Sequence, residues 1–457
     1  MIIPMNQYIR SLTLTLSIFI PLTFINVSES SELSEAKITL NDLYLFDEIS
    51  SIDVSHSAKQ IAYSVSSVDE KKDRYRNDIW LLDVNKNKKK VLIKGRPWVG
   101  KTKFSPDDTL VGYLAPGRGH YSEYQQIWTI NTNYRTKRQL TKLKANINDF
   151  EWSPDGTQMI LVADSISVDK KTKSSVQTQK PIVIDRYYFK EDGKEFLGDE
   201  RQHLHLLDIK SRTTRQLTKG TSNEILPSWS PDSKKIAYVT KTGEMDRTNN
   251  YDVYVLEIDS TNNPIQLTTN LGADSSSSRP QWSPDGKKIA YLHGGDPALL
   301  WYALQELAVI DLDTKINSIL TKELDRNVSS PQWSDDGQSI YFVIEDNMKS
   351  QLAKYSLTNQ KIKKITPSNY YISGWAKSYV VRNGKIGLIL SNTNSPDEVY
   401  FYDENSLSQQ SHHNSELLSS RKILKTETIS FKAADGEELF GMMIKPDNFD
   451  PSKQYPL

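Results

Sequence analysis

One phrase recurs along this chain: an aromatic residue, then Ser, Pro and Asp, then a short apolar strand. The phrase and its weaker variants are marked by serines at Ser55, Ser105, Ser153, Ser230, Ser283 and Ser334. Successive serines are 50, 48, 77, 53 and 51 residues apart. A period of this length is typical of a repeated β unit, since four short strands and their turns need about 40–50 residues. The repeat therefore predicts a β-propeller.

Further strand signals fall at fixed offsets within each unit. Alternating apolar segments follow the marked strand, for example at 78–83, 126–130 and 252–256, and a Gln-Leu-Thr triplet closes several units. One more unit fits between Ile372 and Tyr402. We therefore predict an all-β fold with seven blades over residues 45–403, and the weak first and last copies leave six or eight blades open.

The chemistry of the phrase is that of a turn. Pro presets φ for the second position of a type I turn, and Asp and Gly suit the positions that follow. We therefore interpret the repeated Ser and Asp residues as parts of hairpins, not as catalytic or ligand-binding groups. The aromatic residue is predicted to end one strand and to pack between neighbouring blades.

The 77-residue step contains an insertion. Residues 165–180 are rich in Lys, Ser and Thr, and residues 181–189 are apolar and aromatic. Insertions in repeat folds lie on one face, often the working face. Two interpretations stay open, a loop that faces a partner domain and a plain extended hairpin.

The N-terminus has the pattern of an export signal. Arg10 precedes an apolar stretch from Leu12 to Ile25, and small residues around Ser30 offer a cleavage site. Pro21 shortens the stretch below the roughly 20 apolar residues that a membrane span needs. We predict a signal peptide over residues 1–30, a short segment over 31–44 and an exported protein, periplasmic or secreted. An uncleaved anchor is the alternative.

Composition excludes several classes of site. The chain has no cysteine, so it has neither disulfides nor thiolate chemistry. Its 57 Lys and Arg residues balance 57 Asp and Glu residues, so we expect no nucleic-acid partner and no membrane partner after signal cleavage. The lysine run at 86–90 is interpreted as a solvated turn.

The chain leaves the repeat near residue 404. Residues 404–425 are polar and predict a linker, and residues 426–433 and 439–444 predict a hairpin around Asp435-Gly436. The loop Lys445-Pro446-Asp447-Asn448-Phe449-Asp450-Pro451 and the ending Tyr455-Pro456-Leu457 follow. These features resemble the opening of the α/β-hydrolase domain in the prolyl oligopeptidase family of serine peptidases, in its acylaminoacyl-peptidase and dipeptidyl-peptidase-like branch. Segments 73–80 and 181–208 also resemble that branch.

The resemblance implies a propeller that caps a hydrolase domain and admits oligopeptides. It also implies a Ser-Asp-His triad, with the Ser in a Gly-x-Ser-x-Gly elbow, and an oxyanion loop of His-Gly-Gly-Pro type. The sequence contains no Gly-x-Ser-x-Gly; the nearest strings begin at Gly220 and Gly337 and lack the second glycine. We therefore assign residues 426–457 to the truncated start of the hydrolase domain, name no catalytic residue, and predict that this chain alone is inactive.

Two groups of residues imitate functional sites. Leu292-His293-Gly294-Gly295-Asp296-Pro297 resembles the oxyanion loop, but it directly follows a blade strand and we interpret it as a blade loop. His203 and His205 share one strand face, and His412 and His413 lie in the linker. Neither pair has partners at metal-ligand spacing, so we expect no metal and no cofactor.

Two functions remain. The first is the substrate-gating propeller of an exported oligopeptidase, with oligopeptides reaching the missing hydrolase domain. The second is a stand-alone periplasmic propeller scaffold that binds a protein partner through its loops. If the terminal hairpin pairs into the propeller, the scaffold is favoured; alone, such a hairpin is marginally stable.

Overall fold

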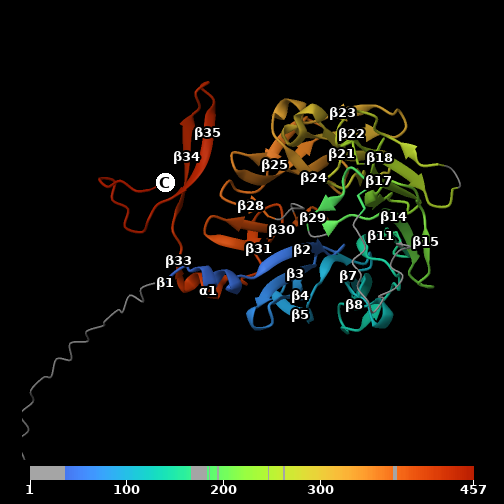
Figure 1. The fold of residues 1–457 in the computed structure, drawn as a ribbon, viewed down its shortest axis with the longest axis horizontal. Coiled ribbons are helices and arrows are strands. Elements are labelled where there is room, and N and C mark those ends of the chain that lie inside the picture. The colour runs from blue at the N-terminus through green and yellow to red at the C-terminus, as the bar shows by residue number, and fades with distance from the viewer. Residues whose placement is uncertain are drawn as a thin grey trace, which may run out of the picture.

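Seven sheets, six of four strands and one of five, stand in a ring (Figure 1), the arrangement in which a propeller encloses a central channel. The structure is a computed structural model, and it describes residues 36–165, 183–184, 186–192, 195–244, 246–260, 263–373 and 378–456. The predicted signal peptide and most of the polar insertion lie outside these residues. Each sheet is antiparallel and is built from consecutive strands, so each is one blade. The prediction of an all-β propeller with seven blades is confirmed.

The blades follow the chain in order, with the innermost strand first. Blades 1 to 4 comprise β2 (Glu48–Val54), β3 (Gln60–Asp69), β4 (Arg74–Asp83) and β5 (Lys88–Arg96); β6 (Gly100–Phe104), β7 (Leu110–Pro116), β8 (Gln125–Asn131) and β9 (Lys137–Gln139); β10 (Ile147–Trp152), β11 (Gln158–Asp164), β14 (Gln202–Asp208) and β15 (Thr214–Gln216); and β16 (Glu224–Trp229), β17 (Lys235–Lys241), β18 (Tyr251–Glu257) and β19 (Ile265–Gln266).

Blades 5 to 7 continue the pattern, except that the inner strand of blade 7 is split in two. They comprise β20 (Gln281–Trp282), β21 (Lys288–Gly294), β22 (Gln305–Asp311) and β23 (Asn317–Ile319); β24 (Val328–Trp333), β25 (Ser339–Asp346), β26 (Lys349–Ser356) and β27 (Lys361–Lys364); and β28 (Tyr371–Ile372) with β29 (Tyr379–Arg382), β30 (Lys385–Asn392), β31 (Ser395–Tyr402) and β32 (Leu407–Gln409).

The remaining elements lie outside the blades. They are β1 (Ala36–Lys37), β12 (Lys190–Glu191), β13 (Glu195–Phe196), α1 (Ser415–Ser419), β33 (Arg421–Lys422), β34 (Thr426–Lys432) and β35 (Glu438–Ile444), with short 3-10 helices at Leu40–Leu45, Glu70–Lys72, Gly119–Tyr121, Pro297–Tyr302 and Lys322–Leu324. Strands β34 and β35 form a hairpin that projects from the ring (Figure 1). Within the described residues, no helix has the length and apolar character that a membrane crossing needs.

The repeated Ser and Asp build the turn between the first two strands of a blade. In all five copies from Ser105 to Ser334, the Ser hydroxyl donates to the Asp carboxylate at 2.5–2.6 Å. The hydroxyl oxygen also accepts from the backbone N–H five residues on. The residue after the Asp has positive φ in each copy, and Gly156, Gly286 and Gly337 supply it without strain. The interpretation of the phrase as a turn is confirmed.

The repeated tryptophans join neighbouring blades. The indole N–H of Trp282 donates to the carbonyl of Ser228 in the preceding blade at 3.2 Å. Trp152, Trp229 and Trp333 make the same bond to the blade before them, at 2.9–3.3 Å. The predicted packing of this aromatic residue between blades is confirmed. The apolar core accordingly divides into clusters that lie between successive blades.

The ring closes without exchanging a strand. Blade 1 and blade 7 each consist of one continuous stretch of chain, and they pack against each other through one shared apolar core cluster. Side chains outside the blades add further contacts. The Asn414 amide accepts from the backbone N–H of Asp47 at 2.8 Å and donates to its carbonyl at 3.0 Å. Arg421 makes two bonds to Asp42, at 2.7 and 3.0 Å, and β1 pairs with β33. We call these contacts the clasp.

The segment expected as a linker is more ordered than its polarity indicated. Residues 404–425 contain β32, which completes blade 7, and α1 and β33, which belong to the clasp region. Ser411 is fully buried, and its hydroxyl accepts from the backbone N–H of Val399 at 2.7 Å. The polar side chains are used as hydrogen-bonding partners here, which is why the composition of the segment resembled that of a loop.

Candidate substrate-facing surface and central channel

One face of the ring collects the long loops and both linking segments. Because the strands of each blade are antiparallel, the Ser-Pro-Asp turns lie on one face, and the connections between the second and third strands lie on the other. That second face, here called the loop face, carries the connections at 117–124, 165–201 and 295–304. The chain also enters blade 1 and leaves blade 7 there. The insertion therefore starts and ends on the loop face, and β12 and β13 form a small hairpin within it.

Three cations and three carboxylates meet in the channel. Lys101 on β6 contacts Asp149 and, at 2.9 Å, Glu151, both on β10. Arg279, which precedes β20, bonds to Asp149 at 2.6 Å. Lys103 lies 3.9 Å from Glu151 and 3.7 Å from Asp53 of β2. We call these six side chains the channel network.

The channel network ties together blades that are not neighbours. Asp149 belongs to blade 3 and Arg279 to blade 5, so their bond passes the channel side of blade 4. Each of the six side chains is at most 24% exposed. The network thus links the inner edges of blades 1, 2, 3 and 5 across part of the channel.

The charges of the network control each other's ionisation. Burial alone would raise the pKa of Glu151, but Lys101, Lys103 and Arg279 outweigh it and hold that pKa far below its ordinary value. Burial likewise opposes ionisation of Asp149, and Arg279 and Lys101 lower the pKa of this carboxyl overall. Both carboxylates are therefore ionised at neutral pH.

These lowered pKa values predict acid sensitivity. The two carboxylates favour folding at every pH above their ordinary pKa, and this contribution is lost as the pH falls through the folded-state values. We expect the free energy of unfolding to hold from about pH 7 to pH 5 and to fall steeply below about pH 4. Urea titrations across this range measure it. Glu151→Gln has one fewer titrating group and should show a shallower acid slope; an equal slope would contradict the prediction.

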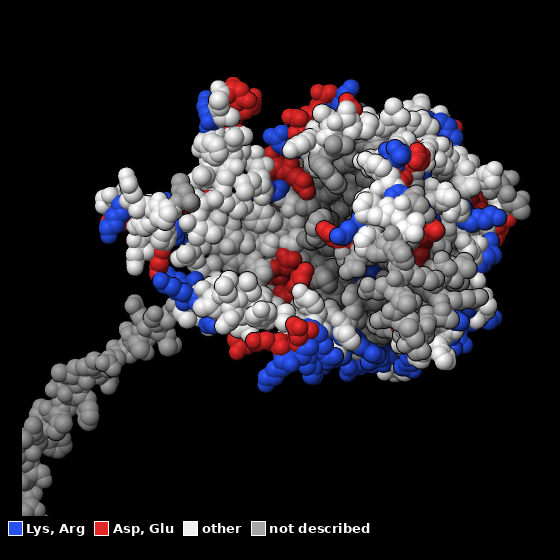
Figure 2. Space-filling model, viewed as in Figure 1, with Lys and Arg blue, Asp and Glu red and all other residues white. Residues whose placement is uncertain are grey.

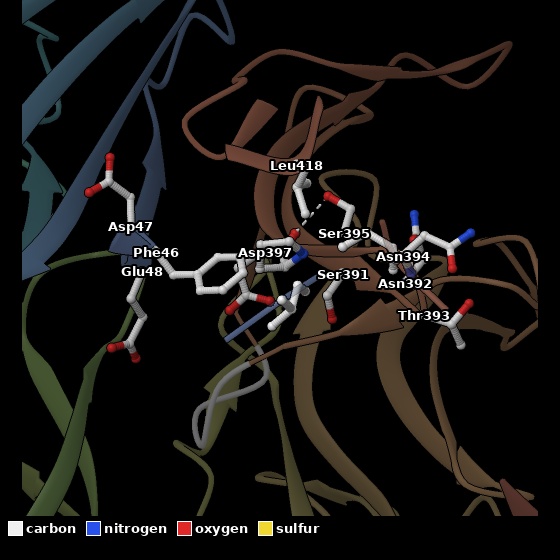
Figure 3. A pocket seen from close by; sticks show the side chains of 13 residues that line it. Phe46, Asp47, Glu48, Ser391, Asn392, Thr393, Asn394, Ser395, Asp397 and Leu418 are labelled. Carbon is white, nitrogen blue, oxygen red and sulfur yellow. Dashed lines mark hydrogen bonds between the residues drawn. The ribbon is translucent and has the colours of Figure 1, made fainter. Parts of the chain in front are cut away.

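A cavity of about 530 Å³ opens on the loop face beside the clasp (Figure 3). Its walls come from the segment before blade 1, from the β30–β31 turn and from Leu418 and Ile423. Phe46 points toward Asp397 across it (Figure 3). Burial, with the charges of Glu48 and Glu398, raises the pKa of Asp397 although two serine hydroxyls oppose this. The cavity therefore combines apolar side chains with three carboxyl groups, those of Asp47, Glu48 and Asp397.

A second cavity, of about 390 Å³, lies at the channel mouth between blades 1 and 2. Tyr75 and Trp98, 62% and 40% exposed, stand beside it, and Lys101 of the channel network forms part of its wall. The Asn77 amide donates to the carbonyl of Pro97 at 3.0 Å and so fixes the loop that carries Trp98. An alanine at Gly100 would place its Cβ 2.6 Å from the Trp98 ring, so this glycine makes room for the indole.

The string that imitates an oxyanion loop belongs to blade 5. Gly294 ends β21, and its N–H already donates to Asp274 at 2.8 Å. A Cβ at Gly294 would lie 2.3 Å from the backbone nitrogen of Ala273, so the glycine permits close packing of two chain segments. The string therefore belongs to the blade, as interpreted, but its first half, Leu292 to Gly294, is the end of strand β21 and only its second half is loop.

Of the two histidine pairs, His203 is buried and His413 is half-buried. The Nδ1 atom of His203 lies 2.8 Å from a carboxylate oxygen of Glu224, which also accepts from the Thr218 hydroxyl. His413 packs edge-on against Tyr63 and Trp80, and its Nε2 atom lies 3.1 Å from the Tyr63 hydroxyl. Across the described residues, no three His, Asp or Glu side chains gather as a metal site would require.

The residues of the channel network were not predicted from the sequence, although a local sequence pattern indicates four of them. Lys101 and Lys103 alternate on one predicted inner strand, and Asp149 and Glu151 alternate on the next. Alternate residues share one face of a strand, and an inner strand turns one edge toward the channel. The clasp had no such signal, because its residues are 379 positions apart at Asp42 and Arg421.

Peptidases are among the relatives of this chain. An uncharacterised peptidase of Bacillus subtilis, YuxL, is 25% identical over 224 residues, which are 48% of this chain and 34% of the relative. Dipeptidyl-peptidase 5 of Porphyromonas endodontalis is 24% identical over a 482-residue alignment that covers 99% of this chain and 67% of the relative. The chain thus spans between one third and two thirds of the relatives it matches. No protein-family model matches it.

Solved structures show the same fold. Acylaminoacyl peptidase of Pyrococcus horikoshii superposes with a TM-score of 0.70 over 89% of this chain and 59% of the peptidase, at 16% identity. The β-propeller domain of the Trilobed protease from Pyrococcus furiosus superposes with a TM-score of 0.56 over 81% of this chain and 97% of that domain, at 15% identity. These findings support the assignment of the chain as a propeller part of the prolyl oligopeptidase family. The resemblance inferred from the repeat and the terminal hairpin is therefore confirmed.

Proposed function

We propose that this prolyl oligopeptidase-family propeller is the substrate-gating part of an exported serine oligopeptidase. The arrangement of the loop face carries the proposal. The long connections, both cavities, the clasp and the hairpin β34–β35 gather where the chain enters and leaves the ring. A hydrolase domain that continued from the hairpin would face this surface, and peptides would reach it past the loops.

The channel network supports a gate rather than an open pore. Six paired charges link inner strands across the channel, so an extended peptide would have to displace buried ion pairs to pass them. Passage between the loop face and a facing domain requires no such step. We propose that peptides are admitted by this lateral route, and that size selection takes place there.

The alternative of a stand-alone scaffold receives less support. The scaffold hypothesis would be supported if the terminal hairpin completed a blade. In the part of the chain that the structure describes, β34 pairs only with β35, and Phe431, Leu439 and Ile444 are 44–60% exposed. Such an exposed apolar hairpin is better explained as part of a larger interface.

The chain by itself is expected to have no peptidase activity. Its sequence contains no nucleophile elbow, and hydrolysis in this family requires a Ser-Asp-His triad. The purified chain should release no chromophore from dipeptidyl and aminoacyl chromogenic substrates. Turnover that a serine-directed inhibitor abolishes would overturn this prediction. Separately, an in-frame continuation encoding the Ser elbow beyond codon 457 would support the proposed gate.

A further inference from the structure

The charge balance of the whole chain hides a strong asymmetry. Residues 48–144, which build blades 1 and 2, contain 19 Lys and Arg residues and 10 Asp and Glu residues, a net charge of +9, although the chain as a whole is neutral. Lys and Arg gather along the lower edge of the molecule in Figure 2, where Figure 1 places β4, β5 and β8. The expectation of no anionic partner rested on the sum of the charges, whereas recognition depends on their distribution.

The cations of the outer strands of these two blades form one surface. We call Lys88, Lys89, Lys94, Arg96, Lys137 and Arg138 the basic rim; all six are exposed on β5 or β9. Lys90 joins the strands by donating to the carbonyl of Thr132 at 2.7 Å. Burial and then the charge of Arg96, in the other blade, lower the pKa of Lys137.

Neither ion pairing nor edge protection accounts for the basic rim. Among the described residues, its six cations form no ion pair, whereas Lys86 in the preceding turn pairs with Asp83 at 3.5 Å. Lysines on outer strands can prevent edge-to-edge aggregation. However, the equally exposed outer strands β19 and β32 carry neither Lys nor Arg, so the fold does not require them.

The shape of the rim favours a flat anionic surface. Proteins that hold single-stranded nucleic acid use a basic groove with stacking aromatics, and none of the six rim residues lines either of the two cavities described above. The rim is instead the outer edge of two blades, and Tyr134, 83% exposed, stands at the β8–β9 turn beside Arg135. Clustered cations with an exposed tyrosine suit the headgroup region of a bilayer.

We propose that the basic rim is a docking surface for an anionic phospholipid bilayer. The contact is peripheral and electrostatic, so it requires anionic lipid and weakens with salt. It would hold the ring by the outer edges of blades 1 and 2 and leave the loop face open. The proposal is independent of the gating function, because it uses none of the residues of the channel network, the clasp or the cavities.

The test is co-sedimentation of the full chain with vesicles of phosphatidylcholine, with and without about one third phosphatidylglycerol. The triple variant Lys88→Glu/Lys89→Glu/Lys137→Glu should lose at least about tenfold in partitioning to the anionic vesicles. The matched control Lys315→Glu/Lys361→Glu/Lys363→Glu changes the net charge equally at exposed positions of blades 5 and 6, and should stay within about twofold of the parent chain. Circular dichroism verifies folding, and the Lys→Gln versions repeat the comparison with a smaller charge change.

Three outcomes would overturn the proposal. Equal binding to neutral vesicles would assign the contact to an apolar segment such as residues 12–25, which all variants share. An equal loss in the control would assign it to net charge alone. Tighter binding of duplex DNA than of anionic vesicles at the same salt concentration would assign the rim to nucleic acid.

Discussion

Replacing Asp149 with Ala should destabilise the folded chain by about 3 kcal/mol, the lower end of the range for breaking a buried ion pair. The substitution leaves Arg279 and Lys101, 17% and 21% exposed, without the carboxylate that both contact. Glu151 remains 2.9 Å from Lys101 and 3.4 Å from Arg279, which keeps the loss from being larger. Urea unfolding followed by tryptophan fluorescence measures the change.

A double-mutant cycle separates the ion pair from simple loss of packing. In Asp149→Ala/Arg279→Ala the guanidinium that loses its partner is also removed, and Lys101 keeps Glu151 at 2.9 Å. The double variant should therefore lose at least about 1 kcal/mol less than the sum of the single variants. Asp259→Ala removes an exposed carboxylate, 97% accessible and 3.7 Å from Arg215, and should change stability by no more than about 0.5 kcal/mol. Additive losses in the cycle would contradict a coupled network.

The ring could be predicted because the same turn motif and the strand after it recur in most of the units. A Ser, an Asp two residues later and then a residue with positive φ specify one turn, with Pro between Ser and Asp in four of the five copies, and each copy predicts the strand that follows it. The hydrogen bonds of the turn itself need no partner that is remote in sequence. A single copy of the turn would not identify a fold, but the repeat period made it possible to estimate the number of blades.

The clasp and the polar contacts of the final blade depend on distant pairs. Asn414 bonds to Asp47, and neither residue carries a local pattern that names the other. The same holds for His203, whose partner Glu224 lies in the next blade and makes its burial possible. A polar segment has the composition of a loop whether its side chains are exposed to solvent or form hydrogen bonds within the protein.

The channel network falls between these two cases. Its alternation at Lys101 and Lys103 is visible locally, and it places both side chains on one face of an inner strand, next to the neighbouring blade. The partner Arg279 precedes a strand of only two residues in blade 5, so its position could not be placed from the pattern. Charged residues at alternate positions of an inner strand are thus the signal to look for in a propeller.

The largest expected effect concerns the aromatic residue of the repeated phrase. Trp282→Ala should lower the free energy of unfolding by about 3–5 kcal/mol, since it removes a large buried side chain between two blades. Trp282 is 8% exposed and belongs to the core cluster shared by blades 4 and 5. Trp282→Phe keeps a ring but loses the bond to the Ser228 carbonyl, and should cost about 1–2 kcal/mol.

Trp98→Ala is the matched control, because the same residue type is removed at a position that is 40% exposed. It should cost no more than about 1 kcal/mol, so urea unfolding of the three variants should rank Trp282→Ala far below Trp282→Phe and Trp98→Ala. The Trp282 side chain packs between blade 5 and the blade before it. The loss of stability should therefore also appear as faster hydrogen exchange in both β16 and β21. If Trp282→Ala cost no more than Trp98→Ala, the aromatic residue of the phrase would belong to its own turn and not to the joint between blades.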